Sequence, residues 1–519
     1  MTKRHSYRRK VKYILLRSRR EGSRRFGSLQ DWKIQLIFWM GALMVGLTIQ
    51  LFAIATEHAS EWFEASLEYS RYTPLVTAPL GMMLVVWVMT RVSMAVQGSG
   101  IPQVLLVIKQ RYSWLRPAFL SIRVAATKLV LTCAGLMFGA SIGREGPSVH
   151  IGAAIMHRVG KRGALHKRYL DNSLIVAGGA AGVAAAFNAP MAGIVFAIEE
   201  LSQSFEQRTS GTLIVAIILS GVVVLAMSGH YSYFGNAKGA LPLETSWYAI
   251  IITAIICGAL GGLFGLLLVK GTHWLAPHLR RYPLRIAAAC GLIVALIGFM
   301  TGGVTYGSGY EQAKVLITGE ESGDWLFPIA KFAATLVSYY SGIPGGLFSP
   351  SLATGAGLGA LIGEHLPGVS VTAITVVAMA SYLSGVIQRP ITSFVIVLEL
   401  TGNNHEFLLP LMAGAFIAYG ASKLVHLRPL YDALAHGLAE GAVHPLEVDA
   451  TKDAGKATKE KSEASVGAKL PDGKAEERPA EESEKAAEPS SETGGKPAAP
   501  DAATPSQPPD GKAPNKGQN

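Results

Sequence analysis

One glutamate offers the clearest chemistry in this chain. Glu145 stands in the motif Gly143-Arg144-Glu145-Gly146-Pro147, which apolar sequence surrounds. A carboxylate in such surroundings is costly and commonly marks an ion or proton pathway. Burial favours its protonated form, whereas a helix N-terminus and Arg144 favour its ionised form, so the side chain could titrate in use. A structural ion pair with Arg144 is the alternative interpretation.

Two further motifs combine glycine and proline in the same way, GSGIP at Gly98–Pro102 and GIPGGLFSP at Gly342–Pro350. Proline is favoured in the first turn of a helix, and glycine permits irregular backbone before it. Each of the three motifs therefore predicts a helix that begins within the membrane. Unpaired N–H groups and a partial positive charge at a helix start suit an anion, and three starts could converge on one. Close packing of membrane helices is the alternative explanation of these residues.

Other ionisable residues lie next to apolar sequence. Glu199 and Glu200 end the apolar run Leu174–Ile198, where a pair of carboxylates at the membrane boundary is the plain interpretation. Lys128 precedes Glu145 by seventeen residues, and we expect it either to add positive potential to a pathway or to extend its ammonium to the membrane surface. We interpret His150 as a helix-packing residue.

Two enzyme-like patterns lack their partners. Gly139–Gly143 matches GxSxG formally, but that motif needs a strand, turn and helix in a soluble sheet. His405-Glu406 begins like HExxH, yet Pro410 stands near the place of the second histidine. The rival class of protein is therefore an intramembrane hydrolase, but the sequence lacks the residues that its catalysis needs. We predict neither an enzyme nor a bound cofactor or metal.

The elements that carry these residues are membrane helices. Half of the 519 residues are hydrophobic, only 16% are charged and the mean hydropathy is +0.31. A helix needs about 20 apolar residues to cross a bilayer. Candidate spans are Ile34–Thr56, Leu75–Thr90, Leu174–Ile198, Thr209–Ser228, Tyr248–Val269, Ile286–Gly303, Leu366–Gln388 and Phe407–Ser422. The sequence predicts an all-α integral membrane protein with many spans.

Charge predicts topology. Residues 1–33 hold twelve Lys and Arg, which favours a cytoplasmic N-terminus, and the basic loop Lys109–Arg123 suits the same side. The acidic loops Glu57–Glu68 and Glu311–Asp324 would suit the outside. The net charge of +11 then reflects topology and an anionic lipid surface, and we expect no nucleic-acid partner.

The chain divides into three parts by composition. Residues 1–33 form a basic segment, residues 34–446 form the membrane domain, and residues 447–519 are a low-complexity tail without Phe, Tyr or Trp. Such a tail cannot bury enough apolar surface to offset its ordering entropy, so we predict that it is disordered. We expect no folded C-terminal regulatory module and a cytoplasmic C-terminus.

The membrane part contains a weak internal repeat. Pro147–Ala153 (PSVHIGA) resembles Pro350–Ala356 (PSLATGA) at a spacing of 203 residues. Pro190 with Glu199 resembles Pro390 with Glu399 at a spacing of 200. Paired, Gly/Pro-interrupted apolar segments in two halves indicate a transporter whose site lies at the repeat interface.

Taken in order, GSGIP, GREGP and Gly346-Leu347-Phe348-Ser349-Pro350 resemble the signature of the chloride channel/transporter (CLC) family. Arg428-Pro429-Leu430-Tyr431 resembles the tyrosine element of that family, and the likeness covers residues 34 to 440. The resemblance implies a homodimer with one anion pathway per subunit, each built from two inverted halves of many tilted and broken helices. Short loops favour a prokaryotic inner (plasma) membrane.

The resemblance also implies roles for single residues. Ser99 and Tyr431 would offer hydroxyls to a central chloride, beside the backbone N–H groups of Leu347 and Phe348. Glu145 would be the external gate, a tethered competitor when ionised that swings away when protonated. Glu200 matches the internal proton-transfer glutamate of the antiporters.

Glu200 therefore favours chloride/proton antiport, with a passive voltage- or pH-gated chloride channel as the alternative, because channels of the family usually carry an apolar residue there. Fluoride export is disfavoured because Ser99 and Tyr431 match the chloride pattern. Nitrate preference is disfavoured because proline is common at the position of Ser99 in nitrate-selective relatives.

Overall fold

The computed structural model describes residues 29–163, 168–202, 210–229, 233–237, 243–320 and 323–440. The expected basic segment up to residue 28 and the expected tail 447–519 lie outside the described residues. The regular elements of the described part are helices, joined at two places by isolated β-bridges. The longer helices are α2 (Leu29–Tyr69), α3 (Pro74–Val92), α4 (Ile101–Ile108), α6 (Ile122–Met137), α7 (Glu145–Arg162), α8 (Arg168–Phe187), α9 (Pro190–Phe196), α10 (Ser210–Ser228), α11 (Leu243–Arg281), α12 (Pro283–Met300), α13 (Tyr310–Thr318), α14 (Leu326–Tyr340), α15 (Phe348–His365), α16 (Val371–Ile387), α17 (Pro390–Leu400) and α18 (Leu408–Val425).

Seven helices of the described residues are long and apolar enough to cross a membrane. The number is eight if the bent pair Tyr112–Phe119 and Ile122–Met137 is one span. Helices on the outside of the domain expose large apolar side chains, such as Leu36, Leu47, Val222, Ile252 and Leu263. Such side chains are stable only against lipid or another apolar surface. The prediction of a many-spanning all-α membrane protein is confirmed.

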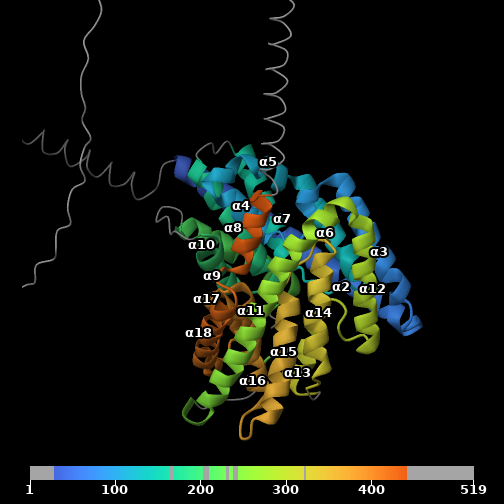
Figure 1. The fold of residues 1–519 in the computed structure, drawn as a ribbon. Helices are drawn as coiled ribbons and strands as arrows, with labels where there is room; N and C mark the ends of the chain where they lie inside the picture. Colours follow the sequence, from blue (N-terminus) through green and yellow to red (C-terminus); the bar gives the residue numbers. More distant parts are fainter. Residues whose placement is uncertain are drawn as a thin grey trace, which may run out of the picture. The chain divides into compact units, whose positions relative to one another are not determined.

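The second half repeats the first, helix by helix. α2, α3 and α4 correspond to α11, α12 and α13, and α6 to α10 correspond in order to α14 to α18. Corresponding helices have similar lengths: α2 has 41 residues and α11 has 39, and α7 and α15 have 18 each. The matched pair α3 and α12 packs side by side (Figure 1).

The two halves are inverted with respect to each other. Glu199, just beyond the end of α9, accepts hydrogen bonds from the N–H groups that begin α17, at Ile391 and Thr392. Glu399, near the end of α17, accepts hydrogen bonds from the start of α9. The end of each helix thus lies at the start of the other, so α9 and α17 run antiparallel. The predicted inverted repeat is confirmed.

The centre of the domain is formed by α7, α8, α15 and α16. Every residue of α16 from Ala373 to Ile387 is buried, and α7 packs closely on α8. Small residues permit this packing: a Cβ on Gly152 would collide with the carbonyl oxygen of Gly178. Two motifs of the candidate site begin the central helices α7 and α15, so a packed core holds them.

Several expected boundaries were wrong. The run Leu174–Ile198 is not one span, because Asn188 has a φ of +52° and Pro190 begins a new helix, α9. The expected acidic loop Glu57–Glu68 belongs to α2, which runs from Leu29 to Tyr69. Its carboxylates recur at helical spacing, so the helix continues past the apolar stretch without burying them.

The other charged loops are also partly helical. Glu311 lies in the first turn of α13, within the expected acidic loop Glu311–Asp324. The expected basic loop Lys109–Arg123 contains two short helices, Gln110–Leu115 and α5 (Arg116–Phe119). Arg116 does not face solvent there: it is buried and pairs with Asp171 at 2.5 Å. A local charge count cannot distinguish such a buried partner from a surface charge.

Candidate functional site

The three Gly/Pro motifs meet at one place. The N–H of Gly98 donates to the carbonyl of Ile343 at 3.3 Å, and the N–H of Gly345 donates to the carbonyl of Gly98 at 3.4 Å. Gly143 and Gly346 exchange two backbone hydrogen bonds of 2.8 and 2.6 Å. A side chain on Gly346 would press on the backbone of the second motif, so glycine permits this approach. The predicted convergence of the motifs is thereby seen directly.

Each motif starts a helix, as the sequence predicted. α4 begins at Ile101 after Gly100, α7 begins at Glu145, and α15 begins at Phe348. In these three described helices, the side chain of the N-cap residue (Gly100, Arg144 or Leu347) makes no capping hydrogen bond. Buried helix starts without caps leave donors and positive potential for another acceptor. Three such starts around one point make a site for an anion.

Four residues proposed to hold the anion lie around this junction. Ser99 and Tyr431 are fully buried; their hydroxyls lie near each other, and neither has another hydrogen-bond partner among the described residues. The ring of Phe348 stacks on that of Tyr431 with centroids 6.1 Å apart, and Leu347 immediately precedes the start of α15. A buried hydroxyl without a partner costs about 1–3 kcal/mol. A dehydrated anion would satisfy both hydroxyls together with the N–H groups of α15.

Glu145 lies at the same junction, against the start of α15. Its side chain is 1% exposed, and its Oε1 accepts a hydrogen bond of 2.5 Å from the Ser349 hydroxyl. Its Oε2 has no partner among the described residues. Arg144 reaches in another direction, where it donates to the carbonyl of Ala53 and the hydroxyl of Thr56 at 3.0 and 3.2 Å. Ser349 therefore holds one oxygen of the Glu145 carboxylate, and the other oxygen is left without a protein donor among the described residues.

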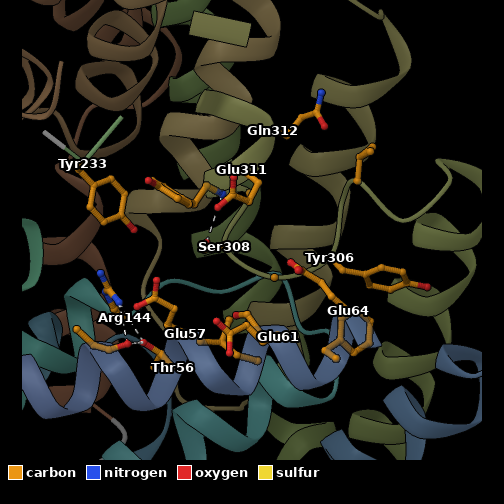
Figure 2. Close-up of a pocket in the computed structure, with 18 of the residues that line it drawn as sticks. Thr56, Glu57, Glu61, Glu64, Arg144, Tyr233, Tyr306, Ser308, Glu311 and Gln312 are labelled. Atoms are coloured by element: carbon orange, nitrogen blue, oxygen red, sulfur yellow. Dashed lines mark hydrogen bonds between the residues drawn. The ribbon is translucent and has the colours of Figure 1, made fainter. Parts of the chain in front are cut away.

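An open cavity of about 760 Å³ leads from the surface to Glu145 and Arg144. Figure 2 shows Glu57, Glu61 and Glu64 along one face of α2, with Glu311 of α13 on the opposite wall. The carboxylates make this cavity electrostatically negative, which concentrates cations and protons and repels anions. Glu145 thus lines a cavity that is open to the surface.

Glu200 is buried in a π-helical turn at Ala197–Leu201. Its Oε2 pairs with Nε of Arg389 at 2.7 Å, and Nη2 of Arg389 pairs with Asp432 at 2.9 Å. Sequence reasoning missed Arg389 and Asp432. The only local signal was their position, directly before the proline of α17 and directly after Tyr431.

Glu199 has a different surrounding. Its two oxygens accept from the N–H groups of Ile391 at 3.2 Å and Thr392 at 2.6 Å, so it caps α17. Glu199 and Glu200 therefore do not act as a pair: their partners differ. Adjacent carboxylates on a helix point in different directions, and here one caps a helix while the other forms an ion pair.

Lys128 does not extend to the membrane surface. It is fully buried, and its Nζ donates to the carbonyl of Gly98 at 3.0 Å, which ties α6 to the GSGIP motif. His150 is also buried and bonds to the carbonyl of Phe119 at 2.8 Å, as expected of a packing residue. Lys128 therefore fixes the backbone beside Ser99 and brings a positive group close to the junction.

The family profile described as voltage gated chloride channel matches residues 81–423. The chain belongs to the CLC family. It is 30% identical over 441 residues to the H⁺/Cl⁻ exchange transporter ClcA of Yersinia pestis bv. Antiqua (strain Angola), a match that covers 78% of this chain and 88% of the relative. The family transports ions, so the hydrolase alternative is set aside.

Two solved structures share the fold. A slow cyanobacterial Cl⁻/H⁺ antiporter gives a TM-score of 0.69 at 23% identity, with 78% of this chain and 98% of that chain covered. A CLC-type fluoride/proton antiporter gives 0.63 at 22% identity, with 78% and 99% covered. This CLC protein is therefore a multi-pass membrane protein that transports anions, with the helical architecture of these antiporters.

Proposed function

We propose that this CLC protein exchanges chloride for protons, with Glu145 as the external gate and Glu200 as the internal proton-transfer group. The observation that carries the proposal is the position of two buried carboxylates around one anion site. Glu145 begins α7, and Glu200 is joined through Arg389 to Asp432, the residue that follows Tyr431. The exchanger relatives support the same reading.

The mechanism follows from charge. Ionised Glu145 competes with chloride for the helix starts of α7 and α15, because both are anions that seek the same N–H groups. A proton from the outer cavity neutralises Glu145 and ends this competition, so chloride can occupy the junction. Ser99, Tyr431 and the N–H groups of Leu347 and Phe348 then replace the water around the ion.

Proton transfer requires a second carboxylate, because Glu145 opens to the outer cavity only. Glu200 supplies it from the other side of the junction. One proton moves from protonated Glu145 to ionised Glu200 and is released on the inner side, which restores the anionic gate. Exchange follows because proton loss from Glu145 returns a competitor to the anion site.

We further propose a homodimer in the plasma membrane, with both termini cytoplasmic. The basic segment 1–33 supports that orientation. We propose chloride as the transported anion over fluoride, because Ser99 and Tyr431 match the chloride pattern of the family. A passive channel remains the second candidate, since the anion site alone would conduct.

Purified protein in liposomes separates the two candidates. With a chloride gradient as the only driving force, an antiporter moves protons against their own gradient, and a fluoride gradient serves as the comparison. We expect proton uptake that depends on chloride. Chloride flux without proton movement would show a passive channel and leave the family assignment unchanged. Stronger coupling of protons to fluoride than to chloride would show that fluoride is the transported anion.

A further inference from the structure

The inner carboxylate belongs to a series of charges that reaches the surface. Glu200 pairs with Arg389, Arg389 pairs with Asp432, and Asp432 lies 3.5 Å from Nζ of Lys109. The side chains are 1%, 14%, 22% and 50% exposed in that order. Glu200 is therefore linked to the solvent-exposed surface by alternating charges.

The guanidinium of Arg389 bonds to two carboxylates at once. Its Nε donates to Glu200 and its Nη2 donates to Asp432. The planar fork of arginine makes this possible, whereas a lysine ammonium is a single point charge on a flexible stem. Arg389 can thus share one positive charge between a buried and a partly exposed acid.

The backbone fixes Arg389 between α16 and α17. Gln388 before it has a φ of +56°, and its amide donates to the carbonyl of His426 at 2.5 Å and to the Ser422 hydroxyl at 3.1 Å. Pro390 after it starts α17. The side chain therefore projects from a break that two helices and a proline hold in place.

The charges around Glu200 leave Arg389 as its counter-ion. Among the described residues, Arg389 is the basic residue with an ion pair to Glu200, and it also pairs with Asp432. Glu199 is engaged with the N–H groups of α17. The neighbouring helix α4 has no charged residue.

The two oxygens of Glu200 are not equivalent. Oε2 accepts from Arg389, whereas Oε1 has no hydrogen-bond partner among the described residues. Arg389 therefore orients the carboxyl group and leaves one oxygen open for a proton.

We propose that Arg389 is the positioning residue for proton transfer at Glu200, and that Asp432 controls how much of its positive charge Glu200 receives. This inference rests on the proton role proposed for Glu200. Loss of Arg389 removes the stabilisation of the ionised carboxyl, so Glu200 would keep its proton to higher pH. Without the charge of Asp432, the positive charge of Arg389 would act on Glu200 alone, so Glu200 would lose its proton at lower pH.

The test compares Arg389→Gln and Asp432→Asn with the wild type, with chloride-driven proton flux measured against inner pH. We expect the pH dependence to move up by about one pH unit in the first variant and down by less in the second. Arg389→Lys should lie between the first variant and the wild type. The half-saturating chloride concentration should stay unchanged in all three.

The outcomes separate this inference from the proposed function. No proton flux in the wild type would overturn both. Wild-type exchange with unmoved pH profiles, or with both profiles moved in one direction, would overturn the role of Arg389 alone. Altered chloride dependence without a pH shift would assign Arg389 to the anion path instead. If Arg389→Gln does not fold, Asp432→Asn decides, since it retains both Arg389 and Glu200.

Discussion

The two halves of the membrane domain share a scaffold but differ at the candidate site. At a spacing of 203 residues, Gly143 corresponds to Gly346 and Pro147 to Pro350, and both pairs belong to motifs that start central helices. At the same spacing, Glu145 of the first half corresponds to Phe348 of the second half. The same backbone therefore presents a titratable gate in one half and an aromatic ring in the other.

Residues that the halves share make equivalent contacts. Lys128 bonds to the carbonyl of Gly98, and Lys331, also at a spacing of 203, bonds to the carbonyls of Thr305 and Gly307 at 3.0 and 2.8 Å. Both lysines are fully buried and hold the loop before a short helix. The shared contacts are those that fix backbone.

The glutamates near the ends of α9 and α17 also divide into residues that both halves carry and one that only the first half carries. Glu199, after α9, caps the start of α17, and Glu399, 200 residues later in α17, caps the start of α9. The next residue is Glu200 in the first half and Leu400 in the second. A charge that both halves carry supports the fold, and we infer that a charge that only one half carries performs transport. The following predictions test that division, from the largest effect to the smallest.

Glu145→Gln should abolish proton movement while chloride permeation persists or becomes faster. The amide keeps the shape of a protonated carboxyl but can neither carry a proton nor compete as an anion. Paired chloride and proton flux measurements in liposomes check this, with Glu399→Gln as the control that keeps coupling. Persistent chloride-driven proton pumping in Glu145→Gln would remove Glu145 from the gating role.

Glu200→Ala should stop proton movement and leave chloride flux that no longer responds to a pH gradient. The inner acceptor is then missing, whereas the anion site is unchanged. Leu400→Met, at the equivalent position of the second half, should retain full coupling because it conserves apolar volume. Equal loss of coupling in both variants would mean that Glu200 acts through packing.

Lys128→Met and Lys331→Met should each lower stability by about 1–3 kcal/mol, because buried loop carbonyls lose their donor. Thermal unfolding of the detergent-solubilised protein measures this. Proton coupling should survive in whichever variants fold. A stability loss confined to one lysine would contradict their equivalence.

Glu199→Gln and Glu399→Gln should have the smallest effects, about 0.3–1 kcal/mol each, because the amide still accepts a hydrogen bond but loses its charge at a helix start. Thermal unfolding should show similar shifts, and flux ratios should equal the wild type. Loss of coupling in Glu199→Gln alone would place Glu199 on the proton path.

The helix starts of the site could be read from local sequence. Glycine frees the backbone and proline fixes the first turn, so Glu145 and Phe348 begin helices where their motifs predicted. The break at Asn188 was missed, because hydropathy does not report a left-handed backbone residue inside an apolar run. The extent of α2 was missed for a related reason, since its carboxylates interrupt hydropathy but not helical geometry.

By itself, the sequence determined a many-spanning helical membrane protein, the repeat and the residues around which an anion could bind. These depend on apolar length, on Gly/Pro chemistry and on motifs of a few adjacent residues. Only the tertiary structure decided which charges meet. Glu200 and Arg389 are 189 residues apart and become an ion pair of 2.7 Å because inverted halves bring the end of α9 to the start of α17. Pairing across such distances depends on how helices pack, which no local pattern encodes.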